Sequence, residues 1–191
     1  MKLLCATTNP DKFGTGKETL KQYGVELEQV IMEIAEIQHE DATAIIEDKV
    51  AKAFAIAQKP IVVTDDSWSI QALGGFPGPY MKSINHWFTP DDFMHLMSGH
   101  TNRKVFLNQL VAYTDGTETV VFRKDLAGEI VQQPRGNYGP TIMHVVSFPE
   151  DGGRTISEMY DTQGAHFGKR LSEIENGWHE LGKWLAIHRK D

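Results

Sequence analysis

Hydrophobic positions in the N-terminal third of the chain recur with two different periods. Three short apolar or alternating stretches predict β-strands, at residues 2–7, 25–34 and 61–63. From residue 42 to residue 58 the apolar positions instead recur at three- and four-residue steps, which predicts a helix of about four turns that ends before Pro60. After the first strand, a polar turn predicts another helix, capped by Asn9 or Asp11 and stopped at Gly24.

The middle of the chain carries the pattern of a β-hairpin. Residues 104–113 and 118–125 are apolar runs on either side of the turn TDGT, and an Asp-Gly turn between such runs is a strong hairpin signal. Further strands are predicted at residues 128–133 and 141–148, and helices at residues 80–88, 90–99, 155–160, 168–175 and 178–189. This order predicts a mixed α/β fold. We expect one domain over residues 1–191, with two lobes and a central cleft where a ligand binds.

Composition narrows the functions that this fold can carry. The chain has 191 residues, 40% of them hydrophobic, which is enough for a full-sized core. A net charge of −7, without any Lys/Arg run, argues against binding to nucleic acid or to a membrane surface. Cys5 is the single cysteine, so no disulfide can form within the chain, and we interpret it as a core thiol. No stretch has the roughly 20 apolar residues of a membrane span, and we expect a cytoplasmic protein.

Carboxylates follow three of the apolar segments of the N-terminal third. These acids are Glu36, Glu47, Asp48, Asp65 and Asp66. Loops at one end of a sheet converge, and carboxylates brought together raise one another's pKa unless they share a cation. Hard oxygen ligands of this kind suit Mg²⁺. The alternative is that the first three acids are solvated surface residues. Asp65 and Asp66 follow a strand directly and cannot both face bulk water if that strand is central.

A second group of polar residues follows the first strand. Thr7, Thr8, Asn9 and Lys12 combine hydroxyl, amide and ammonium donors with the backbone N–H groups of a helix start. That combination is typical of a phosphate site. The alternative is a surface helix with a solvated lysine. Acids for a metal on one loop and donors for phosphate on another favour a magnesium nucleotide, because the ion offsets the repulsion between acids and phosphates.

Several motifs together resemble a known family. The segments TTNPDK, AEIQ, TDDS and ALGGFPGPYMK, in this order, are similar to those of the inosine triphosphate pyrophosphatase family, as are residues 122–136 and 155–159. The resemblance covers most of the chain. It implies a two-lobed fold with a central cleft, and Mg²⁺ between protein carboxylates and the triphosphate. It also implies hydrolysis between the α- and β-phosphates of a non-standard purine nucleotide, and a homodimer.

The same resemblance implies roles for individual residues. It makes Thr7, Asn9 and Lys12 ligands of the triphosphate, and Asp66 the base that activates the attacking water. The implied metal ligands are Glu36, Asp65 and Asp66, and the implied catalytic residues are Asp66, Asp65 and Lys12. Further substrate contacts are implied at Lys52, Ser67, Gly74, Gly75, Phe76, Lys82 and His166.

The segments that read the base in that family differ in this chain. The family's Gly-aromatic-Asp-Pro pattern is replaced by YGPTIMHVVSFP, where Thr141 or His144 takes the place of the acid. The family's Ser-His-Arg is replaced by Ala-His-Phe around His166, and Asp161 stands where a lysine is expected. His166 is then either a base or phosphate contact or a structural histidine. Because these groups normally hydrogen-bond the base, the base preference is open.

We therefore expect a Mg²⁺-dependent nucleoside triphosphate pyrophosphatase with Asp66 as its base. One alternative is a nucleotide-binding protein of the same fold with little turnover. Another is a house-cleaning pyrophosphatase for a different modified base. Retention of Lys12 and of the acids favours catalysis, because a protein that only binds would gain nothing from a group that activates water.

Overall fold

The computed structural model describes residues 1–163 and 174–188. These residues form a mixed sheet with the strand order β2-β1-β3-β5-β6-β7, and β4 pairs with β3 outside this path. Helices accompany the sheet, which confirms the predicted mixed α/β class. In the same part of the chain, no helix is both long and apolar enough to span a bilayer.

The chain divides into two compact units. Among the described residues, the first comprises Met1–Asp65, Gln109–Lys124 and 174–188, and the second comprises Asp66–Asn108 and 125–163. Three strands belong partly to each unit: β3 (Ile61–Ile70), β5 (Lys104–Thr114) and β6 (Thr119–Ile130). That a ligand binds in a cleft between two lobes stays a prediction.

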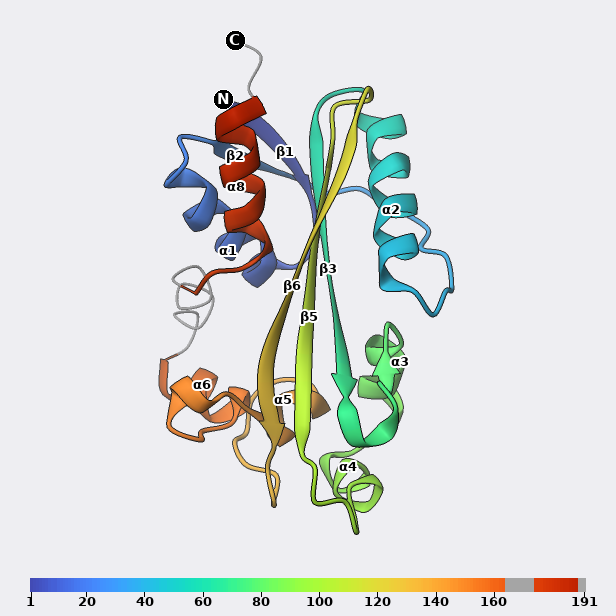
Figure 1. Cartoon of the computed structure of the whole chain (residues 1–191), viewed down its shortest axis with the longest axis vertical. Helices are drawn as coiled ribbons and strands as arrows, with labels where there is room; N and C mark the ends of the chain where they lie inside the picture. The colour runs from blue at the N-terminus through green and yellow to red at the C-terminus, as the bar shows by residue number, and fades with distance from the viewer. Residues whose placement is uncertain (164–173, 189–191) are drawn as a thin grey trace. The chain divides into compact units, whose positions relative to one another are not determined.

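The first unit is a three-layer arrangement of helices on both faces of a sheet. Its own elements are β1 (Lys2–Ala6), α1 (Pro10–Lys21), β2 (Glu26–Val30), α2 (Ala42–Ala57) and α8 (Gly177–His188). Strand β1 pairs in parallel with both β2 and β3. Helices α1 and α8 cover one face of these strands, and α2 covers the other (Figure 1).

Both faces of this sheet are buried, and β3 supplies side chains to each. Val62 packs in a core cluster with the fully buried Trp178 of α8. Ile61 and Val63 pack in the opposite cluster with apolar residues of α2, among them Ile46. Continuous apolar runs are expected for a strand covered on both faces, because successive side chains point to opposite sides. The strand predicted at IVV is therefore confirmed, and the structure places it inside the sheet, between β1 and β5.

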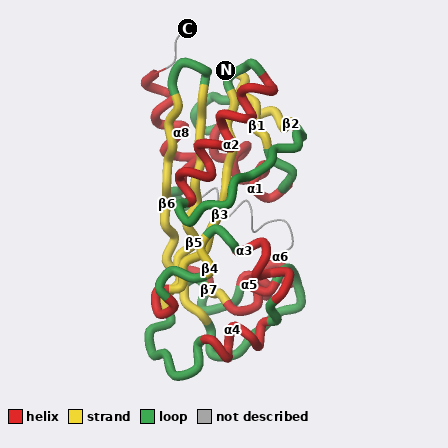
Figure 2. The backbone as a smooth tube through the Cα atoms, turned by 90° about the vertical axis from the view of Figure 1, so that its right-hand side faces the viewer, coloured by secondary structure: helices red, strands yellow, loops and turns green. Residues whose placement is uncertain are grey.

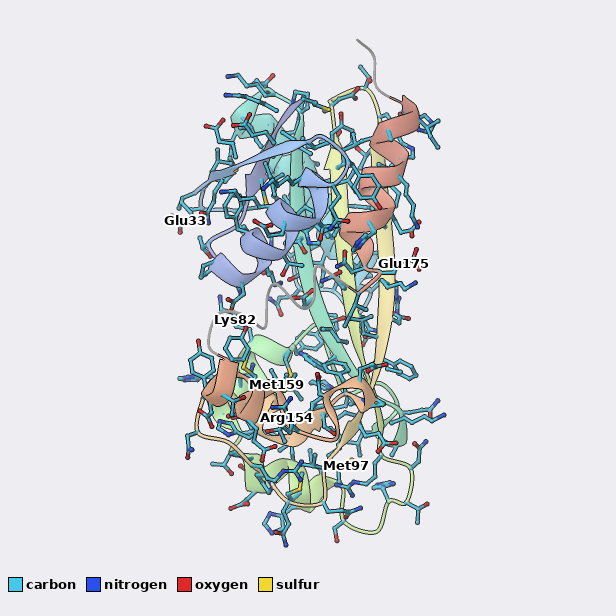
Figure 3. The ribbon with its side chains drawn as sticks, turned by 90° about the vertical axis from the view of Figure 1, so that its left-hand side faces the viewer. Glu33, Lys82, Met97, Arg154, Met159 and Glu175 are labelled. Atoms are coloured by element: carbon cyan, nitrogen blue, oxygen red, sulfur yellow. The ribbon has the colours of Figure 1, made fainter. Side chains whose placement is uncertain are left out.

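The second unit combines short helices with the remaining strand segments. Its own elements are β4 (Pro77–Gly78), α3 (Met81–Trp87), α4 (Pro90–Leu96), α5 (Thr141–Val145), β7 (Val146–Ser147), α6 (Ile156–Gln163) and the 3₁₀ turns Gln71–Leu73 and Pro149–Asp151. Helix α5 contacts both α4 and α6 (Figure 2). Met97 after α4 and Met159 on α6 are both buried, and Figure 3 labels them.

Most predicted elements are confirmed, but three boundaries differ and one predicted strand is wrong. The strand predicted at residues 25–34 ends at Val30, and of residues 128–133 only the first three are strand, as the end of β6. Strand β3 runs seven residues beyond the predicted end at Val63, to Ile70. Residues 141–148, predicted as a strand, are helix α5 followed by the short β7. The helix predicted at residues 168–175 lies largely outside the described residues.

The helical start of the 141–148 segment has a tertiary cause. The Thr141 hydroxyl donates a hydrogen bond to the Phe88 carbonyl at 2.5 Å, and the Ile142 N–H donates to the Asn85 side chain at 3.2 Å. Both partners are more than 50 residues away in the sequence. The apolar alternation of this segment favours a strand, but these contacts satisfy polar groups at the helix start.

Candidate functional site

Asp65 and Asp66 lie inside strand β3, not after its end. The expectation that they mark the exit of a strand is therefore wrong, because β3 continues to Ile70. Successive residues of a strand point to opposite faces of a sheet, so the two carboxylates project in opposite directions. Both side chains are half-buried. The two acids therefore have separate surroundings, and each has to be considered by itself.

Asp65 is paired with Lys12, which lies in the first turn of α1, the helix that follows the neighbouring strand β1. The Lys12 ammonium lies 3.5 Å from Asp65 Oδ1, and both side chains are about three-quarters buried, with 22% and 27% exposed. Strand β1, which leads into the Lys12 helix, is the parallel neighbour of β3. The structure thus brings together two of the three predicted catalytic residues, from segments more than 50 residues apart.

The turn between β1 and α1 is held by its own polar side chains. Asn9 is the N-cap of α1, and its Oδ1 accepts hydrogen bonds from the N–H groups of Asp11 at 2.9 Å and Lys12 at 3.2 Å. Thr7 Oγ1 accepts a bond from the Asn9 N–H at 3.2 Å, and Thr8 is exposed. The cap fixes the first turn of α1 and with it the start of the Lys12 side chain. The predicted Asn9 cap is confirmed.

Glu36 lies in the loop after β2, and two lysines of α2 hold this loop. Lys49 Nζ lies 2.6 Å from Glu36 Oε1. Lys52 Nζ donates to the Ala35 carbonyl at 2.8 Å and lies 2.6 Å from Asp48 Oδ2. Lys52 was predicted as a phosphate contact, whereas in this structure its ammonium binds the loop. Sequence reasoning missed Lys49, and its three-residue spacing from Lys52 on one helix was the available signal.

Of the two predicted acids on α2, only Glu47 agrees with the solvated alternative, because Asp48 is half-buried. Glu47 is exposed, and Asp48 pairs with Lys52 one turn later in the favourable order for a helix. Within residues 1–163 and 174–188, no three His, Cys, Asp or Glu side chains form a group that could hold a metal ion. Glu36, Asp65 and Asp66 are therefore not gathered into one cage of carboxylates. Their roles as metal ligands stay a prediction.

In the glycine-rich loop after β3, the backbone conformation is what favours glycine. Gly74 and Gly75 have φ angles of 63° and 97°, in the left-handed region that favours glycine. A Cβ added to either residue would meet open space, so close packing does not require glycine at these two positions. The Phe76 ring lies 6.1 Å from that of Phe88 within the second unit. Lys82, at the start of α3, is exposed.

Ser67 and Cys5 are both buried. Ser67 follows the acids on β3, with 5% of its surface exposed, and its role as a substrate contact stays a prediction. Burial raises the pKa of the Cys5 thiol to about 12, and the nearby Lys49 charge opposes this rise. A thiol with such a pKa is not a nucleophile near neutral pH. The interpretation of Cys5 as a core residue agrees with this environment.

Thr141 and His144, the two candidates for the position of the family's base-reading acid, both form hydrogen bonds within the second unit. Thr141 bonds the Phe88 carbonyl, and the two ring nitrogens of His144 each lie 3.1 Å from a carbonyl oxygen, those of Gly136 and Gly139. Asp161 accepts a hydrogen bond from the Asn137 N–H at 2.8 Å. His166 lies outside the described residues. Which residue replaces the family's acid therefore stays open.

An aromatic pair beside this segment was missed by sequence reasoning. The rings of Tyr138 and Tyr160 are stacked, with centroids 4.6 Å apart and an interplanar angle of 11°. Tyr160 is buried, whereas Tyr138 keeps about half of its surface exposed. The two residues are 22 positions apart in the sequence, so no local pattern indicates their contact.

Comparison with known proteins adds to this geometry. Residues 3–174 match the Ham1 family. The chain belongs to the Ham1 family. A relative from Methanopyrus kandleri, named dITP/XTP pyrophosphatase, is 32% identical over 180 residues, which is 92% of this chain and 93% of the relative. A protein of the same name from Pyrobaculum aerophilum is 30% identical over 191 residues, covering 97% of each chain.

Solved structures agree with this membership at the level of the fold. The Ham1 protein of Staphylococcus aureus superimposes with a TM-score of 0.74 over 99% of this chain and 100% of its own, at 16% identity. A HAM1 protein from Coxiella burnetii gives a TM-score of 0.72 at 17% identity. The family inferred from the TTNPDK, TDDS and ALGGFPGPYMK segments is therefore confirmed, and so is its fold.

Proposed function

We propose that this chain is a nucleoside triphosphate pyrophosphatase that depends on a divalent metal ion. It cleaves the anhydride between the α- and β-phosphates of a non-standard purine nucleotide, such as ITP, dITP or XTP, and releases a nucleoside monophosphate and pyrophosphate. Support comes from membership of the Ham1 family and from the names of two relatives that are at least 30% identical over nearly the whole chain. The observation that carries the proposal to this chain's own residues is the Lys12–Asp65 ion pair beside Asp66.

The β1–α1 turn is the proposed triphosphate site. The Lys12 ammonium is held in the first turn of a helix that Asn9 caps, so a positive charge and the positive end of the helix dipole coincide. Thr7, Thr8 and the Asn9 amide supply hydrogen-bond donors beside it. Further contacts are proposed from Lys52, Ser67, Lys82, His166 and the loop Gly74, Gly75 and Phe76. Phosphate oxygens would replace part of the present partners of Lys12 and Lys52.

We propose Mg²⁺ as the metal ion, with Glu36, Asp65 and Asp66 as the candidate protein ligands, of which Asp65 and Asp66 lie on opposite faces of β3. The donor set fits, because carboxylate oxygens are the ligands that Mg²⁺ prefers, and one or two of them suffice when substrate phosphates supply others. When bound, Mg²⁺ offsets phosphate charge and lowers the pKa of a coordinated water.

Asp66 is the proposed general base. It accepts a proton from the attacking water, whose oxygen forms a new bond to phosphorus while the bond to the bridging oxygen breaks. Asp65 projects from the opposite face of β3, where Lys12 is its partner, so the two neighbouring acids can act separately. Most of the rate increase then comes from positioning and charge, and no covalent intermediate is needed.

The second candidate function is the same hydrolysis with a different nucleobase in the substrate, and a specific observation favours it. In the segment that reads the base in related enzymes, Thr141 and His144 are bound to carbonyl oxygens of their own unit, and Asp161 holds the Asn137 N–H. An acid at position 161 accepts hydrogen bonds, whereas the lysine that it replaces would donate them to a base oxygen. A house-cleaning enzyme for an alkylated or otherwise modified base fits this change.

Pyrophosphate release from a panel of nucleotides tests the proposal. The protein is incubated with Mg²⁺ and ribo- and deoxynucleoside triphosphates, including ITP, dITP and XTP, with ATP and GTP as controls. We expect pyrophosphate as the first product and a preference for non-standard bases. Orthophosphate as the first product would mean that a different bond is cut. Turnover of none of the nucleotides would leave a binding protein of the same fold as the better account.

The variant Asp66→Asn tests the proposed base. The amide keeps the size of the side chain but cannot accept a proton, so turnover should fall about a hundredfold or more while the folded state persists. Circular dichroism and the thermal midpoint provide the control for folding. Full activity in this variant would remove Asp66 from the mechanism.

Two further properties complete the proposal, and the family resemblance implies only the first of them. We expect a homodimer, which analytical ultracentrifugation tests directly, and a cytoplasmic location. A monomer across the whole accessible concentration range would rule out the first.

A further inference from the structure

Lys49 is the most buried lysine among those that contact the proposed site. Only 15% of its side chain is exposed, whereas its partner Glu36 is 44% exposed. The ammonium lies 2.6 Å from Glu36 Oε1. Its charge opposes the rise that burial causes in the pKa of the Cys5 thiol of β1. A cation so far removed from water needs a counter-ion, and Glu36 supplies it.

The oxygen that Lys49 contacts belongs to a proposed metal ligand. A monovalent ammonium and a divalent metal ion are alternative partners for the same carboxylate, and they repel one another when both are close. Lys49 therefore stands where it opposes the approach of a metal ion to Glu36. Its position on the buried side of the ion pair leaves it little freedom to turn away into solvent.

Independent contacts hold the Glu36 loop in place. Lys52, one turn further along α2, donates to the Ala35 carbonyl at 2.8 Å, and Asp48 is its ion-pair partner at 2.6 Å. The residue before Glu36 thus stays attached to α2 without Lys49. Removing the Lys49 charge should free the Glu36 carboxylate without releasing the backbone that carries it.

We propose that Lys49 is a resident counter-cation of Glu36 that competes with the divalent metal ion for this carboxylate. Lys49 is thus a positioning residue that sets how much metal the site requires and keeps Glu36 paired when no metal nucleotide is bound. The inference rests on the proposed function only in taking Glu36 as a metal ligand.

Direct binding of Mn²⁺, measured by electron paramagnetic resonance on the intact protein without nucleotide, tests this role. Lys49→Met removes the charge and keeps a long apolar stem for the buried position. Lys59→Met is the matched control, because Lys59 is exposed just beyond α2 and its loss changes the net charge equally. We expect Mn²⁺ to bind about tenfold more tightly to the Lys49 variant and within about twofold of the original affinity to the control.

A double-mutant cycle shows whether the effect passes through Glu36. In a Glu36→Gln background, Lys49→Met should no longer strengthen Mn²⁺ binding, because the contested carboxylate is gone. An equal gain in that background would overturn the proposal, and so would unchanged or weaker binding in the single variant. Absence of Mn²⁺ binding in both the parent and the Lys49 variant would overturn it as well.

The activity assay keeps this inference separate from the proposed function. If no nucleotide is hydrolysed but the Lys49 and Glu36 variants shift Mn²⁺ binding as described, the pyrophosphatase assignment fails and the role of Lys49 stands. If nucleotides are hydrolysed and the variants leave Mn²⁺ binding unchanged, the pyrophosphatase assignment stands and the role of Lys49 fails.

Discussion

The N-cap of α1 links the stability of the fold to the proposed phosphate site, and two substitutions of one residue separate these effects. Asn9 Oδ1 accepts hydrogen bonds from two backbone N–H groups, at 2.9 Å and 3.2 Å. Asn9→Ala removes this acceptor and leaves both donors without it. Loss of such a cap costs about 1 kcal/mol, within a range of roughly 0.5–2.

Asn9→Asp keeps the acceptor and removes the amide donor. Its carboxylate can accept the same two N–H groups, and a negative charge at a helix N-terminus is stabilising by about 0.3–1 kcal/mol. The same charge repels a triphosphate and removes an N–H that is proposed to bind it. We therefore expect unchanged or higher stability, together with a KM raised about tenfold, which corresponds to about 1.4 kcal/mol of lost binding.

Urea denaturation and nucleotide hydrolysis measure the two effects. With an m value of about 2–3 kcal/mol/M, the Ala variant should unfold at a urea concentration lower by about 0.3–0.5 M. The thermal midpoint of a chain of this size should fall by about 2–4 °C. Equal destabilisation by Ala and Asp would refute the capping argument. An unchanged KM in the Asp variant would show that Asn9 does not face the phosphates.

Two further predictions concern the core of the first unit. Gly16→Ala should lower the free energy of unfolding by about 1–3 kcal/mol, because a Cβ there would lie 2.7–2.9 Å from the buried Trp178 ring. Gly14→Ala is the control on the same helix: a Cβ there has nothing within 4 Å, so this variant should instead be more stable by about 0.5–1 kcal/mol. Similar thermal midpoints for the two variants would contradict the packing argument. Cys5 should resist an aromatic disulfide reagent at pH 8 until the protein is unfolded in urea, because burial raises its pKa to about 12 from the usual 9.0. Since the folded-state pKa lies above the unfolded one, the stability that this thiol contributes is complete below pH 9 and is lost as the pH rises toward 12; rapid labelling of the native protein would contradict its burial.

Local patterns were sufficient where neighbours in the sequence decide the structure. Helix α2 agrees with its prediction to within a residue at its end, because its apolar positions follow the helical period and Asp41 caps it. The β5–β6 hairpin follows from an Asp-Gly turn between apolar runs. The Asn9 cap and the family motifs are equally local. The sequence by itself therefore determined the fold class, the family and the candidate residues.

Contacts between distant segments required the tertiary structure. Two adjacent acids indicate the end of a strand, yet β3 continues through them to Ile70. Its pairing with β1 ends at Val63, but it pairs with β4 further on, at Trp68 and Ser69. The ion pair between Lys49 and Glu36 joins a helix to a loop residue 13 positions earlier. Lys12 of α1 pairs with Asp65 of β3, more than 50 positions later. Side-chain charge shows that a residue needs a partner, but only the packing of helices on the sheet decides which partner it finds.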